Sequence, residues 1–160
     1  MPLSDSIRTR LHHQHETIRE LIGQLPEHHL RQRANPAKWS AFENIAHLAC
    51  YHPVFLYRLH CIREESSPSF DRYVAEADPA FPGYLQQQLT RLLDEMDTQR
   101  KTIIAILEGM NETALRRTGL HARYGLLTVP QWTEFFLLHE AHHLYTIFIL
   151  VQELRRNLPE

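Results

Sequence analysis

The sequence TVPQWTEFFLLHEAHHLYTIFILVQELRR, residues 128–156, carries a long helical pattern. Its apolar side chains recur at the spacing of the buried side of an amphipathic helix. Thr128 and Gln131 have the spacing of a capping box, and Pro130 suits a first helical turn. The segment therefore predicts one long helix that ends near Arg156.

Three more segments show apolar residues at helical spacing: 4–24, 40–64 and 84–108. Ser40 and Glu43 form a second capping box, at the start of the middle segment. Two long irregular connections, 65–83 and 110–127, separate the later helices, and no segment shows the sustained alternation of a strand. The pattern predicts an all-α fold, an up-down four-helix bundle.

Length and charge set further limits. A chain of 160 residues has the length of one domain, so we expect a single domain over residues 1–160. It contains 17 Lys and Arg against 19 Asp and Glu, a formal net charge of −2. Without a basic excess there is little to neutralise a phosphate backbone, so nucleic acid is not an expected partner.

The expected compartment is the cytoplasm. No segment has the length and apolarity of a signal peptide or a membrane span. Cys50 and Cys61 lie in one predicted helix, about 16 Å apart, which is too far for a disulfide. Two unpaired thiols are typical of a cytoplasmic protein, and no membrane contact is expected.

Histidine is unusually common, with 12 residues, and two of them have the spacing of metal ligands. His139 and His143 are four residues apart on one helix face, where two imidazoles can chelate one ion. The segment also matches the H-E-x-x-H pattern of zinc proteases. Those enzymes need a third ligand further along the chain, and no histidine follows His143, so a peptidase is not favoured.

The third ligand is better sought upstream. His47 lies about two turns after the Ser40 cap, among apolar residues of the second predicted helix. Three motifs then occur in order: PAKWSAFENIAHL at 36–48, GLLTVPQW at 125–132 and HxxxH at 139–143. From about residue 39 to residue 145 this pattern resembles the DinB-like superfamily of four-helix metalloproteins, the DinB/YfiT type.

The resemblance implies a divalent metal ion, nickel or zinc, held by His47, His139 and His143. It also implies a homodimer and a small-molecule substrate. Many relatives have Gln a few positions after the last histidine, where this chain has Tyr145, Thr146 and Ile147.

The function stays open between three alternatives. Characterised members of the family resemble S-transferases and isomerases that use a low-molecular-weight thiol such as bacillithiol, mycothiol or glutathione. The first expectation is therefore a metal-dependent thiol S-transferase. The alternatives are a metal-dependent hydrolase that uses metal-activated water, and a non-catalytic metal-binding or ligand-binding module of a stress response. No side chain is assigned as catalytic.

Five residues are candidate neighbours of the metal: Tyr51, His121, Trp132, Glu140 and His142. Tyr51 follows His47 by one turn, and Trp132 precedes His139 by two, so both could line a pocket or simply belong to the core. His121 lies in the connection before the last helix. Glu140 and His142 lie about 100° from the ligands around the helix. Glu140 could act as a base or orient a ligand, but a solvated surface position is favoured, and His142 is expected against another helix or a dimer partner.

Overall fold

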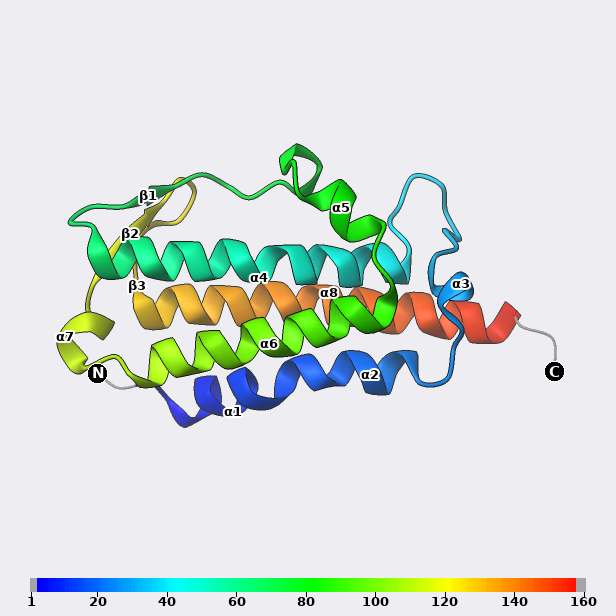
Figure 1. Cartoon of the computed structure of the whole chain (residues 1–160), viewed down its shortest axis with the longest axis horizontal. Coiled ribbons are helices and arrows are strands. Elements are labelled where there is room, and N and C mark those ends of the chain that lie inside the picture. The colour runs from blue at the N-terminus through cyan, green and yellow to red at the C-terminus, as the bar shows by residue number, and fades with distance from the viewer. Residues whose placement is uncertain (1–2, 158–160) are drawn as a thin grey trace.

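Four long helical segments lie side by side in the computed structural model, which describes residues 3–157 (Figure 1). The first segment is made of consecutive pieces: α1 (Asp5–His13), a 3₁₀ turn (Gln14–Glu16) and α2 (Thr17–Ile22). The other three are continuous: α4 (Ala41–Glu64), α6 (Leu89–Glu108) and α8 (Val129–Asn157). The predicted four-helix bundle is confirmed.

The helix starts follow from local chemistry. The Ser40 hydroxyl accepts from the Glu43 amide, and the Glu43 carboxylate accepts from the Ser40 amide, which completes the predicted capping box of α4. The third long helix begins at Leu89 and not near residue 84 as expected. Gln88 is extended there, and the Leu89 amide donates to Glu27 in the short helix α3 (Glu27–Leu30).

The directions of the helices are not a simple alternation. Arg10 pairs with Glu134 at 2.8 Å, and Arg155 donates to the carbonyl of Leu21 at 3.0 Å, so the first segment and α8 are parallel. α4 and α6 also run parallel to each other, in the opposite direction (Figure 1). The order is up-down-down-up and differs from the up-down order expected, because residues 65–88 return along α4 before α6 begins.

The connections between the helices contain a small sheet that the sequence pattern did not predict. Its strands are β1 (Ser69–Phe70), β2 (Thr118–His121) and β3 (Gly125–Thr128); β1 pairs with β2 in parallel, and β2 with β3 antiparallel. Two to four residues are too few to show a period of two, which explains the omission. The sheet lies at one end of the bundle, beside the end of α4 (Figure 1).

Short helices complete the connections: α5 (Phe81–Leu85), α7 (Glu112–Leu115) and a 3₁₀ turn (Ala75–Ala77). α5 packs on α4 and closes the side of the bundle near its start. Gly119 of β2 packs closely, since a Cβ there would come within 2.8 Å of Phe70 and 2.9 Å of Ile62. A side chain at this position would push the hairpin away from α4.

Apolar side chains fill the space between the helices along the whole bundle. Near the start of α4 the core contains Ile45 and, from α8, Ile147. Further along α4, Phe55 stacks on Phe136 of α8 with ring centroids 4.3 Å apart. α4 and α8 therefore contribute to the core over most of their length.

One ion pair is buried in this core. Arg100 of α6 pairs with Glu140 of α8, and both side chains are 1% exposed. Gln14 donates to the same carboxylate at 2.8 Å. The expectation of a surface carboxylate at Glu140 is wrong, because the Glu140 side of α8 faces the core, where the first segment packs on α8 and Arg100 reaches Glu140 from α6.

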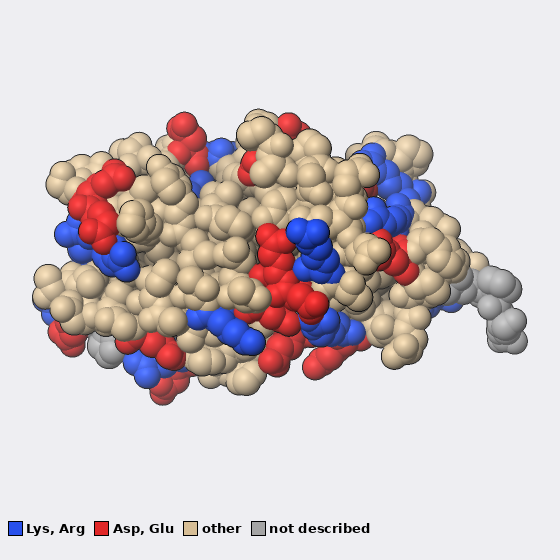
Figure 2. All heavy atoms as spheres, in the orientation of Figure 1, with Lys and Arg blue, Asp and Glu red and all other residues tan. Residues whose placement is uncertain are grey.

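The surface carries both signs of charge. On the face drawn in Figure 2, acidic and basic side chains lie interspersed among uncharged ones. Several apolar side chains of α8 are exposed: Leu138, Tyr145, Phe148 and Ile149. No helix within residues 3–157 is both long enough and apolar enough to cross a membrane.

The buried ion pair leads to a stability prediction. Glu140→Leu leaves the Arg100 charge buried without its partner and should lower the free energy of unfolding by about 3–5 kcal/mol. Arg100→Met combined with Glu140→Leu removes both charges and should recover most of that loss. Urea unfolding of the single and double variants measures both effects. Equal losses in the two proteins would contradict this account.

Candidate metal centre

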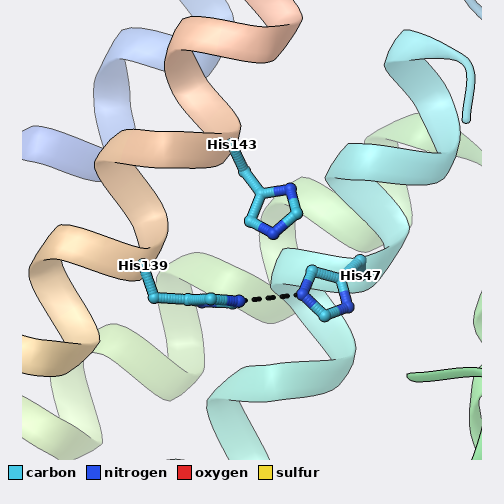
Figure 3. A group of neighbouring side chains, drawn as sticks. All are labelled: His47, His139 and His143. Atoms are coloured by element: carbon cyan, nitrogen blue, oxygen red, sulfur yellow. Dashed lines mark hydrogen bonds between the residues drawn. The ribbon is translucent and has the colours of Figure 1, made fainter. Parts of the chain in front are cut away.

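Three imidazole rings converge between α4 and α8 (Figure 3). His47 comes from α4, and His139 and His143 come from successive turns of α8. One nitrogen of each ring can be chosen so that all three lie within 4.8 Å of one another. The Nε2 atoms of His47 and His139 are 2.9 Å apart. The structure thus brings together the three residues that the sequence selected.

The orientation of His143 is fixed by Asn44, one turn before His47 on α4. The Nδ1–H of His143 donates to the side-chain oxygen of Asn44 at 2.8 Å. The amide nitrogen of Asn44 donates in turn to the backbone oxygen of Ser40 at 2.8 Å, which sets the orientation of the amide. The proton of His143 therefore lies on Nδ1, and Nε2 keeps a lone pair for a ligand bond.

The cluster fits a metal ion in donor type and spacing. Imidazole nitrogens suit zinc and nickel among the divalent ions. Two nitrogens bound tetrahedrally at 2.0–2.1 Å would lie about 3.3 Å apart. The 2.9 Å separation of His47 and His139 needs only a small outward movement to reach that value.

All three imidazoles are in the neutral form that binds metals. Burial lowers the pKa of His47 to about 4, of His139 to about 3 and of His143 to about 2. For His139 and His143, the charge that a neighbouring imidazole of the cluster would carry lowers the pKa further. No proton therefore has to leave these rings near neutral pH before an ion binds.

A cavity of about 320 Å³ lies against the cluster. The three histidines form part of its wall, together with residues of the two connections. Of the five candidate neighbours, Tyr51, His121 and His142 line this cavity. The ring of Tyr51 lies 4.4 Å from that of His139, centroid to centroid.

Trp132 and Glu140 do not line the cavity. Trp132 is fully buried, and its indole N–H donates to the backbone oxygen of Gly119 at 3.2 Å. The β2 strand covers it, so it supports the hairpin instead of facing the cluster. Glu140 lies on the Arg100 side of α8, as described above.

Other cavity residues were missed by the sequence reasoning. Trp39, which directly precedes the Ser40 cap, packs on His47 with ring centroids 5.1 Å apart. Arg58 also lines the cavity. It follows His47 by eleven residues and Tyr51 by seven, which places all three on one face of α4. That spacing could have identified it, whereas Tyr73 and Glu76 lie in an irregular segment without a comparable pattern.

The low pKa values predict how the metal-free protein responds to acid. An unfolded chain takes up protons at histidine below about pH 6.5, whereas the three folded imidazoles stay neutral down to about pH 4 or below. The free energy of unfolding should therefore fall as the pH is lowered from 7 to 5, by up to about 1.4 kcal/mol per pH unit for each histidine.

Urea unfolding at pH 7, 6 and 5 tests this dependence. His139→Asn should make the pH dependence shallower, while His28→Asn at an exposed site serves as the control. An unchanged slope in His139→Asn would contradict the interpretation.

Comparison with known proteins agrees with this architecture. The model of the DinB superfamily matches residues 10–147. YfiT from Bacillus subtilis, described as a probable metal-dependent hydrolase with an unusual four-helix bundle topology, is similar in structure, with a TM-score of 0.82. The sequences are 16% identical, and the match covers 94% of this chain and 87% of YfiT.

A DinB-like protein from Bacillus subtilis is also similar, with a TM-score of 0.63 and 21% identity over 98% of this chain and 96% of that one. No curated protein sequence matches significantly. At these identities the solved structures establish the shared fold, and the family match spans most of the sequence. The chain belongs to the DinB superfamily.

Proposed function

We propose that His47, His139 and His143 bind one divalent ion, zinc or nickel, and that the protein is a metal-dependent enzyme acting on a small molecule. The observation that carries this proposal is the convergence of three neutral imidazoles at the wall of a cavity. Three protein ligands with an open position are typical of catalytic metal sites, whereas structural sites are closed by four.

When bound, such an ion would lower the pKa of a thiol or a water molecule beside it and make the nucleophile available near neutral pH. The protein's own residues position the histidines and exclude solvent from around them. Asn44 holds His143, and the rings of Trp39 and Tyr51 pack beside the histidines. The cavity then offers space for the molecule that is attacked.

Thiol transfer is the reaction we propose first. The Glu of a zinc-protease helix serves as general base, but the corresponding Glu140 is paired with Arg100 away from the cavity. Within the described part of the chain, Glu76 is the one carboxylate residue in the cavity wall. A thiol that loses its proton on binding a metal needs no such base, and the family resemblance favours the same reaction.

Hydrolysis is the second candidate. It is favoured by the description of YfiT as a probable metal-dependent hydrolase. The two reactions would share the three histidines and differ in the nucleophile. A binding module without turnover is the third candidate.

Metal content tests the site itself. Untagged wild-type protein should bind about one equivalent of zinc or nickel, and His47→Ala or His143→Ala should lose most of it, since each variant removes one of three ligands. His142→Ala is the matched control, because this exposed histidine lies beside His143 but outside the cluster. Elemental analysis after dialysis gives the ratio. Equal metal in all four proteins would exclude the proposed ligands.

Turnover tests the reaction. Metal-loaded protein is mixed with a panel of small electrophiles in the presence of bacillithiol, mycothiol or glutathione. Product should form with at least one thiol and fall at least 100-fold in His143→Ala, while His28→Ala, an exposed histidine outside the cavity, keeps most of the rate. Ester cleavage that needs metal but no thiol would favour the hydrolase instead. Tight ligand binding without any turnover would favour the binding module.

A further inference from the structure

Arg58 is a buried cation without an anionic partner among residues 3–157. Its side chain lies near the end of α4, and the residue is 4% exposed. No salt bridge to a described carboxylate is formed, in contrast to the other buried arginine, Arg100, which pairs with Glu140. A buried charge is costly unless it is paired, so the Arg58 environment calls for an explanation.

The contacts of Arg58 hold it in place but use only part of its hydrogen-bonding capacity. Nη1 donates to the hydroxyl of Tyr51 at 3.0 Å, and Nη2 donates to the backbone oxygen of Asp71 at 2.9 Å. The guanidinium carbon lies 5.2 Å from the ring centre of Trp132 and 5.6 Å from that of Phe70. A guanidinium has five N–H groups, and these two bonds leave three of them for another acceptor.

Arginines line the cavity that contains the histidine cluster. Arg58 lines that cavity, as do the exposed Arg72 and Arg123. The acidic residue in the wall is Glu76, which is exposed. Three arginines against one glutamate make the cavity attractive to an anion.

Tyr51 connects the cation to the candidate metal centre. Its hydroxyl accepts from Arg58, and its ring lies 4.4 Å from the His139 ring. A molecule whose anionic end is held at Arg58 would therefore extend past a single phenol ring to reach the cluster. The rings of Tyr73 and Phe135 in the same wall would cover an apolar body.

We propose that Arg58 binds an oxyanion group of the substrate, such as a carboxylate, phosphate or sulfonate, and holds the rest of the molecule against His139. The planar guanidinium suits such groups because it can donate two parallel hydrogen bonds to them. The proposal rests on the proposed function for the role of the substrate, but the anion site itself does not require the metal.

A pair of small ligands tests the site in the wild-type protein without any substitution. Phenylacetate carries a carboxylate, and phenylacetamide has a similar shape without the charge. Calorimetric titration should give at least tenfold tighter binding of phenylacetate. Phenyl phosphate and benzenesulfonate, measured in the same way, identify the preferred oxyanion, and tighter binding of either one than of phenylacetate would support the site equally.

Variants then test whether Arg58 is the residue that binds the anionic group. Arg58→Gln should weaken phenylacetate binding at least tenfold and leave phenylacetamide binding within twofold. Arg63→Gln removes the same charge from an exposed position on α4 outside the cavity and should keep the wild-type affinity. Circular dichroism and urea unfolding check that the Arg58 variant folds; if it does not, the ligand pair in wild-type protein decides alone.

Measurements before and after chelation separate this proposal from the metal site. Phenylacetate binding that persists in the chelated wild-type protein, and is lost in Arg58→Gln, supports the anion site even if no metal is ever found. Binding that is lost on chelation but unchanged in Arg58→Gln would place the carboxylate on the metal and overturn the proposal. Equal affinity for phenylacetate and phenylacetamide would also overturn it.

Discussion

The antiparallel contact between α4 and α8 determines both the core and the candidate metal centre. The two helices share apolar side chains along most of their length. About two turns into α4, this contact replaces apolar residues with His47, His139 and His143. Rings from two helices meet at hydrogen-bonding distance only if the register between the helices is fixed. The Asn44 contact to His143 adds a directional bond between the same two helices, so the register and the ring orientation are set together.

Burying the three histidines between the helices costs folding free energy. Burial makes it unfavourable to charge any of the three imidazoles, which is why their pKa values are low. The Nδ1 atoms of His47 and His139 are buried without a hydrogen-bond partner among the described residues. An apolar core would avoid both penalties. The presence of these histidines at the wall of a cavity therefore suits binding of an ion better than a purely structural role.

The sequence predicted the parts that depend on one helix at a time. Capping boxes located the starts of α4 and α8, and the four-residue spacing selected His139 and His143. The packing and direction of the helices relative to one another were harder to predict from the sequence. Glu140 was misjudged because a helical wheel shows only that it points away from His139, not that the first segment packs on that side and that Arg100 reaches it from α6. The up-down-down-up order was missed for a related reason, since the direction of α6 depends on the path of residues 65–88, which carry no long periodic pattern.

The two buried arginines show how tertiary context assigns different roles to the same residue type. Arg100 lies among α1, α6 and α8, donates to the backbone oxygen of Leu11 and is neutralised by Glu140, so its charge is used within the core. Arg58 has aromatic rings and one backbone oxygen around it, which stabilise a cation but do not neutralise it. Replacing Arg58 by an apolar residue of similar size would serve the fold as well or better, because the charge is costly to bury. Arg58 lines the same cavity as His139, so the unpaired charge is best understood as part of the proposed site.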